Sequence, residues 1–250
     1  MPLLDHLIEL RTRLIYALIS FLGVFFITFY FAKPIFSFLI QPALSDGYKL
    51  QVLDIFEFFF VTVKLSAFLS LIVGFPLIAT QIWLFVAPGL YRREKRAFLP
   101  FLIATPFMFY AGCVVMYYVV MPYVINFMLT QYAPPDIEKN LRASDYLERV
   151  LQLVFAFGFA FEMPVLLTLL VRVGIITTAG LRSKRRYAIV ICFIVAAVLA
   201  PPDVISQIAL AVPLLAFYEL SILIGSRIER KREEEDKKAE AEPDKIGADG

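Results

Sequence analysis

The chain has 250 residues, 60% of them hydrophobic and 25 of them Phe, and its formal net charge is +2. A water-soluble domain cannot bury so large a share of apolar side chains, so the composition excludes a soluble protein and indicates a polytopic membrane protein. The small net charge says little by itself, but the distribution of charge along the chain is informative.

Apolar runs along the chain predict six transmembrane helices and therefore an all-α membrane protein. The runs cover about residues 14–32, 65–88, 97–121, 150–171, 187–200 and 204–225. The first run is too long for the apolar part of a signal peptide and lacks a cleavage site, so it is interpreted as a retained span. Cys113 and Cys192 fall inside predicted spans and are interpreted as small core residues rather than as a disulfide or metal pair.

The last two predicted helices form a short hairpin. The fourteen residues from Tyr187 to Ala200 cover roughly 21 Å, whereas the hydrocarbon core is about 30 Å thick. A span this short has to thin the bilayer, lean on its neighbours or open onto a wet recess. We interpret the hairpin as one wall of a site, although a helix simply tilted against its neighbours would have the same sequence.

Positive charge alternates between the two sides of these spans. Eighteen Lys and Arg residues fall in the two termini and in the loops after the second and fourth spans, and six fall in the other loops. By the positive-inside rule both termini are cytoplasmic. We expect one transmembrane domain over residues 1–228 and a disordered, charged tail over 229–250. An interfacial helix is expected within 33–63, and a shorter cap of turn and helix within 122–149.

The segment before the first span is amphipathic. Placed on a helix, its leucines share one face and Glu9 and Arg13 lie on the other, where they can form an i,i+4 ion pair. Arg11 falls in the middle of the apolar stripe and is expected to extend toward the interface. A second polar group is the loop after the second span, where Glu94 lies among four cations. Glu94 could simply relieve the repulsion within that loop.

Glu162 is the most unusual polar residue, because it lies near the middle of the fourth span, about 15 Å along the helix from Arg172. A carboxylate there costs roughly 2.5–3.5 kcal/mol on insertion scales and is a functional candidate by default. Pro164 frees the carbonyl group of Ala160 nearby. A structural hydrogen bond to another span is the alternative, with Gln81 and Gln207 as the expected polar partners.

Four motifs resemble the TatC family, whose members are core receptor subunits of the twin-arginine protein translocase. The motifs stand in the family's order over nearly the whole chain up to about residue 228. They are HLIELR at 6–11, FVAPGLY at 85–91 with Glu94 after it, FGFAFEMP at 157–164 and APPDV at 200–204 with Ser206 and Gln207.

The resemblance implies a concave cup of helices that recognises twin-arginine signal peptides and helps folded proteins across the membrane, driven by the proton-motive force. It implies single-span TatA and TatB partners and self-association in a receptor complex, with no cofactor, metal or nucleic acid and most simply in a bacterial inner membrane. Signal-peptide binding is expected at Glu9, Arg11, Phe85 and Glu94. A second, intramembrane partner site is expected at Glu162, Gln207, Asp203 and Gln81. Pro42 corresponds to a family position tied to assembly.

Other function classes are weaker. A proton-coupled small-molecule transporter using Glu162 is the main alternative, but no inverted repeat is evident. The chain lacks the catalytic residues that an intramembrane enzyme would need, because His6 is the sole histidine and no Gly-x-Ser-x-Gly motif is present. ATP-driven transport lacks a phosphate-binding loop. We therefore expect a protein that is not an enzyme.

Overall fold

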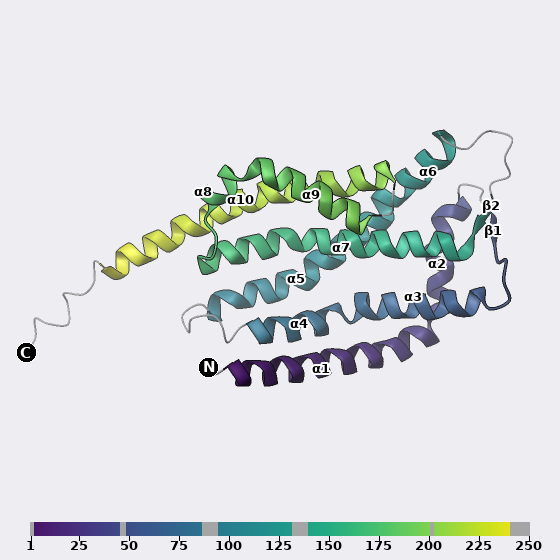
Figure 1. Cartoon of the computed structure of the whole chain (residues 1–250), viewed down its shortest axis with the longest axis horizontal. Coiled ribbons are helices and arrows are strands. Elements are labelled where there is room, and N and C mark those ends of the chain that lie inside the picture. The colour runs from purple at the N-terminus through teal and green to yellow at the C-terminus, as the bar shows by residue number, and fades with distance from the viewer. Residues whose placement is uncertain (1–2, 46–48, 87–94, 132–139, 201–202, 241–250) are drawn as a thin grey trace, which may run out of the picture.

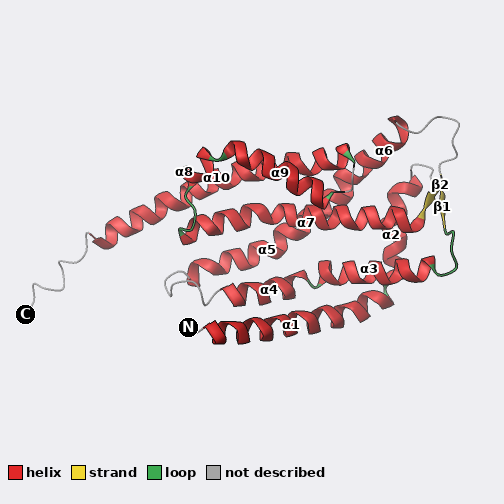
Figure 2. Ribbon diagram, in the orientation of Figure 1, coloured by secondary structure: helices red, strands yellow, loops and turns green. Residues whose placement is uncertain are grey.

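The computed structural model describes residues 3–45, 49–86, 95–131, 140–200 and 203–240, and these are mostly helical (Figures 1 and 2). The helices follow as α1 (Leu3–Tyr30), α2 (Ala32–Ser45), α3 (Glu57–Val73), α4 (Phe75–Val86), α5 (Lys95–Val115), the π-helical segment η2 (Met116–Val120), α6 (Met121–Gln131), α7 (Ala143–Val173), α8 (Thr178–Ser183), α9 (Arg185–Leu199) and α10 (Val204–Glu240). Two strands, β1 (Lys49–Gln51) and β2 (Asn140–Arg142), pair in parallel at one end of the bundle (Figure 1). The expectation of a purely helical chain therefore needs this small correction.

Four helical stretches are long and apolar enough to cross a membrane, and a bent pair makes a fifth. The four are Leu7–Tyr30, Pro100–Phe127, Ala143–Val173 and Val204–Glu234. The bent pair joins α3 to α4, with an angle of 54° between them. The sequence predicted one straight span here. The break falls at Gly74, and Pro76 just after it has no backbone N–H to continue the helical bonding. A Cβ atom at Gly74 would lie 2.5 Å from the carbonyl oxygen of Ser70, so a side chain would not fit.

Several predicted boundaries move when the loops fold. α2 supplies the helix expected in the first loop. The aromatic residues at 56–60 that follow it lie instead at the start of α3, because α3 begins at Glu57. α7 begins at Ala143, seven residues before the predicted span. α6 continues directly from η2, so the third span and the expected cap helix form one nearly continuous helical stretch.

The last helix is longer than expected, and its described residues extend into the segment expected to form the tail. α9 is short, with 15 residues, but α10 has 37 residues and continues through the charged segment to Glu240. Glu, Lys and Arg are good helix formers, so the helix can propagate from its apolar part into water. Glu229 fixes this extension by accepting hydrogen bonds from the backbone N–H (2.9 Å) and the hydroxyl group of Thr178. Figure 1 shows the extension projecting past the other helices.

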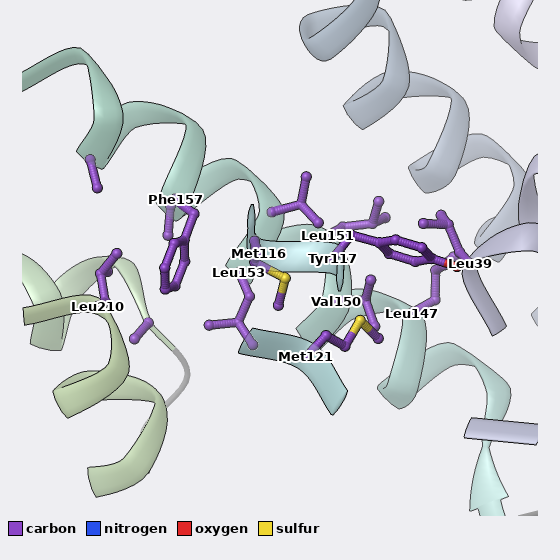
Figure 3. Close-up of a cluster of buried hydrophobic side chains, with 14 of the residues drawn as sticks. Leu39, Met116, Tyr117, Met121, Leu147, Val150, Leu151, Leu153, Phe157 and Leu210 are labelled. Carbon is purple, nitrogen blue, oxygen red and sulfur yellow. The ribbon is translucent and has the colours of Figure 1, made fainter. Parts of the chain in front are cut away.

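α7 is the central helix, in contact with α3, α5, α9 and α10. In lipid, helices associate through close packing rather than through hydrophobic burial, so small residues mark their contacts. Gly112 of α5 and Gly158 of α7 show this: a Cβ atom would lie 2.5 Å from the Phe157 carbonyl oxygen at the first and 2.6 Å from the Phe109 ring at the second. Figure 3 shows the buried side chains that continue this packing along α7, from Phe157 to Leu147.

Candidate functional site

The expected signal-peptide site lies at one end of the bundle. Here α1 begins, α4 ends and α5 begins (Figure 1), and α1 packs along α4. Glu9 and Arg13 form the predicted i,i+4 ion pair, with 3.5 Å between Oε1 and Nη2, and both side chains are half-buried. The opposite side of the helix, with Leu7, Ile8 and Leu14, is exposed, as a lipid-facing stripe would be.

The other residues of this expected site are only partly described. Arg11, which falls within the apolar stripe, is exposed. Phe85 is half-buried in the last turn of α4, at the same end of the bundle as Glu9. Glu94 lies outside the described residues. The fold therefore brings the start of α1 and the flanks of the Glu94 loop to one end.

Glu162 lies within α7 and is only 5% exposed. The donors that face its carboxyl group are the Thr105 hydroxyl and the Phe109 backbone N–H, both from α5. Trp83 of α4 joins this polar cluster by donating its indole N–H to the Thr105 hydroxyl oxygen at 3.2 Å. The Glu162 Oε1 atom is buried and has no hydrogen-bond partner among the described residues. The Trp83–Thr105 bond of α4 and α5 thus lies beside a carboxyl group of α7, whose Oε1 atom has no partner among the described residues.

The other residues of the expected intramembrane site do not bond to Glu162. No hydrogen bond joins Glu162 to Gln81, Asp203 or Gln207 within the described part of the chain. Gln207 instead donates to the Phe193 carbonyl oxygen of α9 at 3.3 Å, and Asp203 caps α10 by accepting from the Ser206 backbone N–H at 2.7 Å. Gln81 has a buried Oε1 atom without a partner.

Thr105 and Trp83 were missed because a hydroxyl and an indole inside an apolar run resemble ordinary core residues. The sequence did hold one indication of a polar partner for Trp83. It is the sole tryptophan, and a buried indole N–H needs an acceptor. Their pairing with Glu162, however, depends on how α4, α5 and α7 pack.

Pro42 lies inside α2, where it leaves the Phe38 carbonyl group without its helical N–H donor. The hydroxyl group of Tyr117 in η2 donates to that oxygen at 2.6 Å, and the two aromatic rings stack with centroids 4.7 Å apart. Pro42 therefore creates the acceptor through which η2 is tied to α2.

A further polar cluster, at the β1–β2 end, was missed by the sequence analysis. Glu57 is 6% exposed and accepts hydrogen bonds from the backbone N–H groups of Leu53 (2.8 Å), Asp54 (3.3 Å) and Ser144 (3.2 Å), and from Arg142 Nε (3.2 Å). This carboxylate accepts from two N–H groups of the loop before α3 and from one N–H group in the first turn of α7, and so joins the two segments. In sequence Glu57 was hidden among aromatic residues, and two of its partners, Arg142 and Ser144, lie more than 80 residues away.

The described residues offer no group of three His, Cys, Asp or Glu side chains that could hold a metal ion. What they do offer is a bundle of apolar helices, a half-buried carboxylate at one end and a buried carboxyl group in the middle. The fold thus defines a multi-pass helical membrane protein.

Comparison with known proteins gives the family. Residues 5–213 match the model of the Sec-independent protein translocase protein TatC family. The TatC protein of Magnetococcus marinus is 42% identical over 96% of this chain and 90% of its own length, and that of Aquifex aeolicus is 41% identical over 94% and 98%. A crystal structure of a twin-arginine translocase receptor, TatC, superposes with a TM-score of 0.81 at 40% identity, covering 90% of this chain and 99% of that one. The chain belongs to the TatC family, a family of membrane protein-transport components and not of enzymes.

Proposed function

We propose that this protein is the receptor for twin-arginine signal peptides and the core of a translocase for folded proteins. The observation that carries the proposal is the half-buried Glu9 at the end of the bundle where α4 ends and α5 begins, on either side of the Glu94 loop. Arginine pairs bidentately with a carboxylate, and two consecutive arginines need two carboxylates. Glu9 and Glu94 would supply the two carboxylates from two segments, and we assign Phe85 and Arg11 to the same site.

The same proposal includes the topology. Six crossings, with both termini in the cytoplasm, follow if α3 and α4 together cross once and the short α9 crosses by leaning on α7 and α10. The crossings would then form a cup. Driving by the proton-motive force and an inner-membrane location belong to this proposal as well.

Binding of a fluorescent twin-arginine peptide to the purified protein tests the receptor role. Glu9→Ala and Glu94→Ala should each weaken binding by about 1.5–3 kcal/mol, because each removes a charge-assisted hydrogen-bond pair. A peptide with two lysines should bind more weakly than the arginine peptide. Glu219→Ala is the matched control, since Glu219 is an exposed carboxylate paired with Arg185 at 2.7 Å. Normal affinity in the Glu9→Ala, Glu94→Ala double variant would overturn the assignment.

We further propose that single-span partners of the TatA and TatB type dock beside α9 and α10. The support is the apolar outer face of α9, where Ile191, Ile194 and Val198 are exposed. Photo-crosslinkers at Val198 and Gln207 should capture such partners, whereas a probe at Ala196, which is fully buried, should not. Capture of lipid alone at Val198 and Gln207 would show that the short hairpin is only structural.

The alternative function, a proton-coupled small-molecule transporter, is favoured by one observation. Glu162 is buried with an unpaired oxygen, as a coupling group would be. The two functions differ in whether Glu162 has to ionise, which is tested below.

A further inference from the structure

A pocket that none of the proposed functions uses lies between α6 and α7 beside β2. We call it the α6–α7 pocket; its volume is about 510 Å³. Apolar side chains of α6 and α7 form its floor, namely Met121, Val124, Ile125, Val150 and Leu153. Figure 3 shows Met121 near Val150 and Leu153.

The charged residues that line the pocket are Arg142, Asp145 and Arg149, and Arg142 is paired with Glu57 just outside the lining. Arg149 is exposed, and although Asp145 lies one turn before it on α7, no ion pair joins these two described residues. Arg142 uses Nε toward Glu57, and its two terminal nitrogens take no part in that bond. The guanidinium groups are therefore available to an anion.

The charged and the apolar residues of this pocket lie at different depths in the membrane. Counted along α7 at 1.5 Å per residue, Arg149 is about 20 Å from Glu162 and Leu153 about 13 Å. With Glu162 near the midplane, Arg149 lies at the level of the lipid headgroups and Leu153 lies within the hydrocarbon layer. A ligand that fills the pocket needs an anionic end and an apolar end in that order.

We propose that the α6–α7 pocket binds an anionic phospholipid, with its phosphate on Arg149 and Arg142 and an acyl chain on the apolar floor. Arginine pairs bidentately with phosphate oxygens, and basic pockets between transmembrane helices suit anionic headgroups. An apolar partner helix fits less well, because it offers no anionic group to pair with Arg149. The site lies at the opposite end of the bundle from Glu9 and does not depend on signal-peptide recognition.

Native mass spectrometry of the full chain in detergent tests the headgroup. Phosphatidylglycerol and phosphatidylcholine with the same acyl chains are added in turn, and the retained lipid is counted. We expect preferential retention of phosphatidylglycerol and a loss of at least fivefold in Arg149→Gln. Lys64→Gln is the matched control, because Lys64 is an exposed cation near the same end of the bundle and outside this pocket. Unchanged retention in Arg149→Gln, or an equal loss in Lys64→Gln, would overturn the proposal.

A second variant tests the acyl chain. Ile125→Trp fills the floor without changing charge and should also reduce phosphatidylglycerol retention, with the thermal unfolding midpoint confirming that the variant folds. Inorganic phosphate at millimolar concentration should not displace the lipid. Displacement by phosphate would show that the pocket holds only the headgroup, and full retention in a folded Ile125→Trp protein would overturn the acyl-chain site.

Discussion

At the residue scale, the buried carboxyl group of Glu162 is the feature that most needs a function. Its burial at 5% exposure would be costly without donors, and the Thr105 hydroxyl and the Phe109 N–H supply only part of what a carboxylate can accept. Trp83 fixes the orientation of Thr105 and hence of the carboxyl group. The Oε1 atom is buried and has no partner among the described residues.

Replacing Glu162 distinguishes polar contact from proton transfer. Glutamine keeps the shape and the hydrogen-bonding capacity but cannot ionise. We expect Glu162→Gln to keep substantial transport of a folded cargo and Glu162→Ala to lose more, while signal-peptide binding survives both. Glu148→Gln, which changes an exposed carboxylate of the same helix, serves as the control. Equal loss of transport in Glu162→Gln and Glu162→Ala would mean that ionisation is required.

At the element scale, small residues set how closely the helices approach. α5 and α7 touch at Gly112 and Gly158, where side chains would overlap with a backbone carbonyl group or an aromatic ring. α1 and α3 meet through a hydroxyl cluster, in which the Thr28 Oγ1 atom lies 3.0 Å from both the Ser70 hydroxyl and the Ser66 carbonyl oxygen. In lipid no hydrophobic effect drives the helices together, so contacts of this kind stabilise their association instead.

Gly158→Ala should destabilise the bundle, because its Cβ atom would lie 2.6 Å from the Phe109 ring and the helices would have to separate. We expect a loss of about 1–3 kcal/mol in the free energy of unfolding, measured in mixed micelles. Gly23→Ala is the control, since nothing lies within 4 Å of its added methyl group. Alanine is the better helix former, so this control should be neutral or slightly stabilising. Equal effects of the two changes would contradict close packing at Gly158.

Tyr117→Phe tests the tie between η2 and α2. It keeps the ring stacked on Phe38 but leaves the Phe38 carbonyl group, already without its helical donor at Pro42, unpaired. We expect a loss of about 0.5–1.5 kcal/mol in the free energy of unfolding, near the range measured for hydrogen bonds within membranes. The neighbouring change Tyr118→Phe should have no such effect, because Tyr118 is exposed.

At the scale of the whole molecule, the two ends of the bundle differ in structure. The β1–β2 end is held by Glu57, which connects loops more than 80 residues apart. The opposite end carries the start of α1 and the long extension of α10, held by Thr178 and Glu229. We propose that the first end lies outside and the second in the cytoplasm.

Labelling of single cysteines tests this orientation, in a protein whose Cys113 and Cys192 are replaced by alanine. Leu53→Cys, at an exposed site near β1, should react with an impermeant maleimide on intact cells. Arg230→Cys, at an exposed site of α10, should react only after the membrane is opened. The reverse pattern would invert the topology, and the sites assigned to Glu9 and Glu94 with it.

The sequence by itself determined the membrane class, the family, the positions of most apolar helices and the Glu9–Arg13 pair. These are local properties, set by hydropathy, motif order and helical spacing. Only the tertiary structure decided the bend at Gly74, the donors that face Glu162 and the buried position of Glu57. Each depends on which helices lie side by side: Trp83, Thr105 and Glu162 come from three separate helices, and Arg142 reaches Glu57 across two loops. A pattern within one segment shows that a polar group has to find a partner, but packing selects the partner.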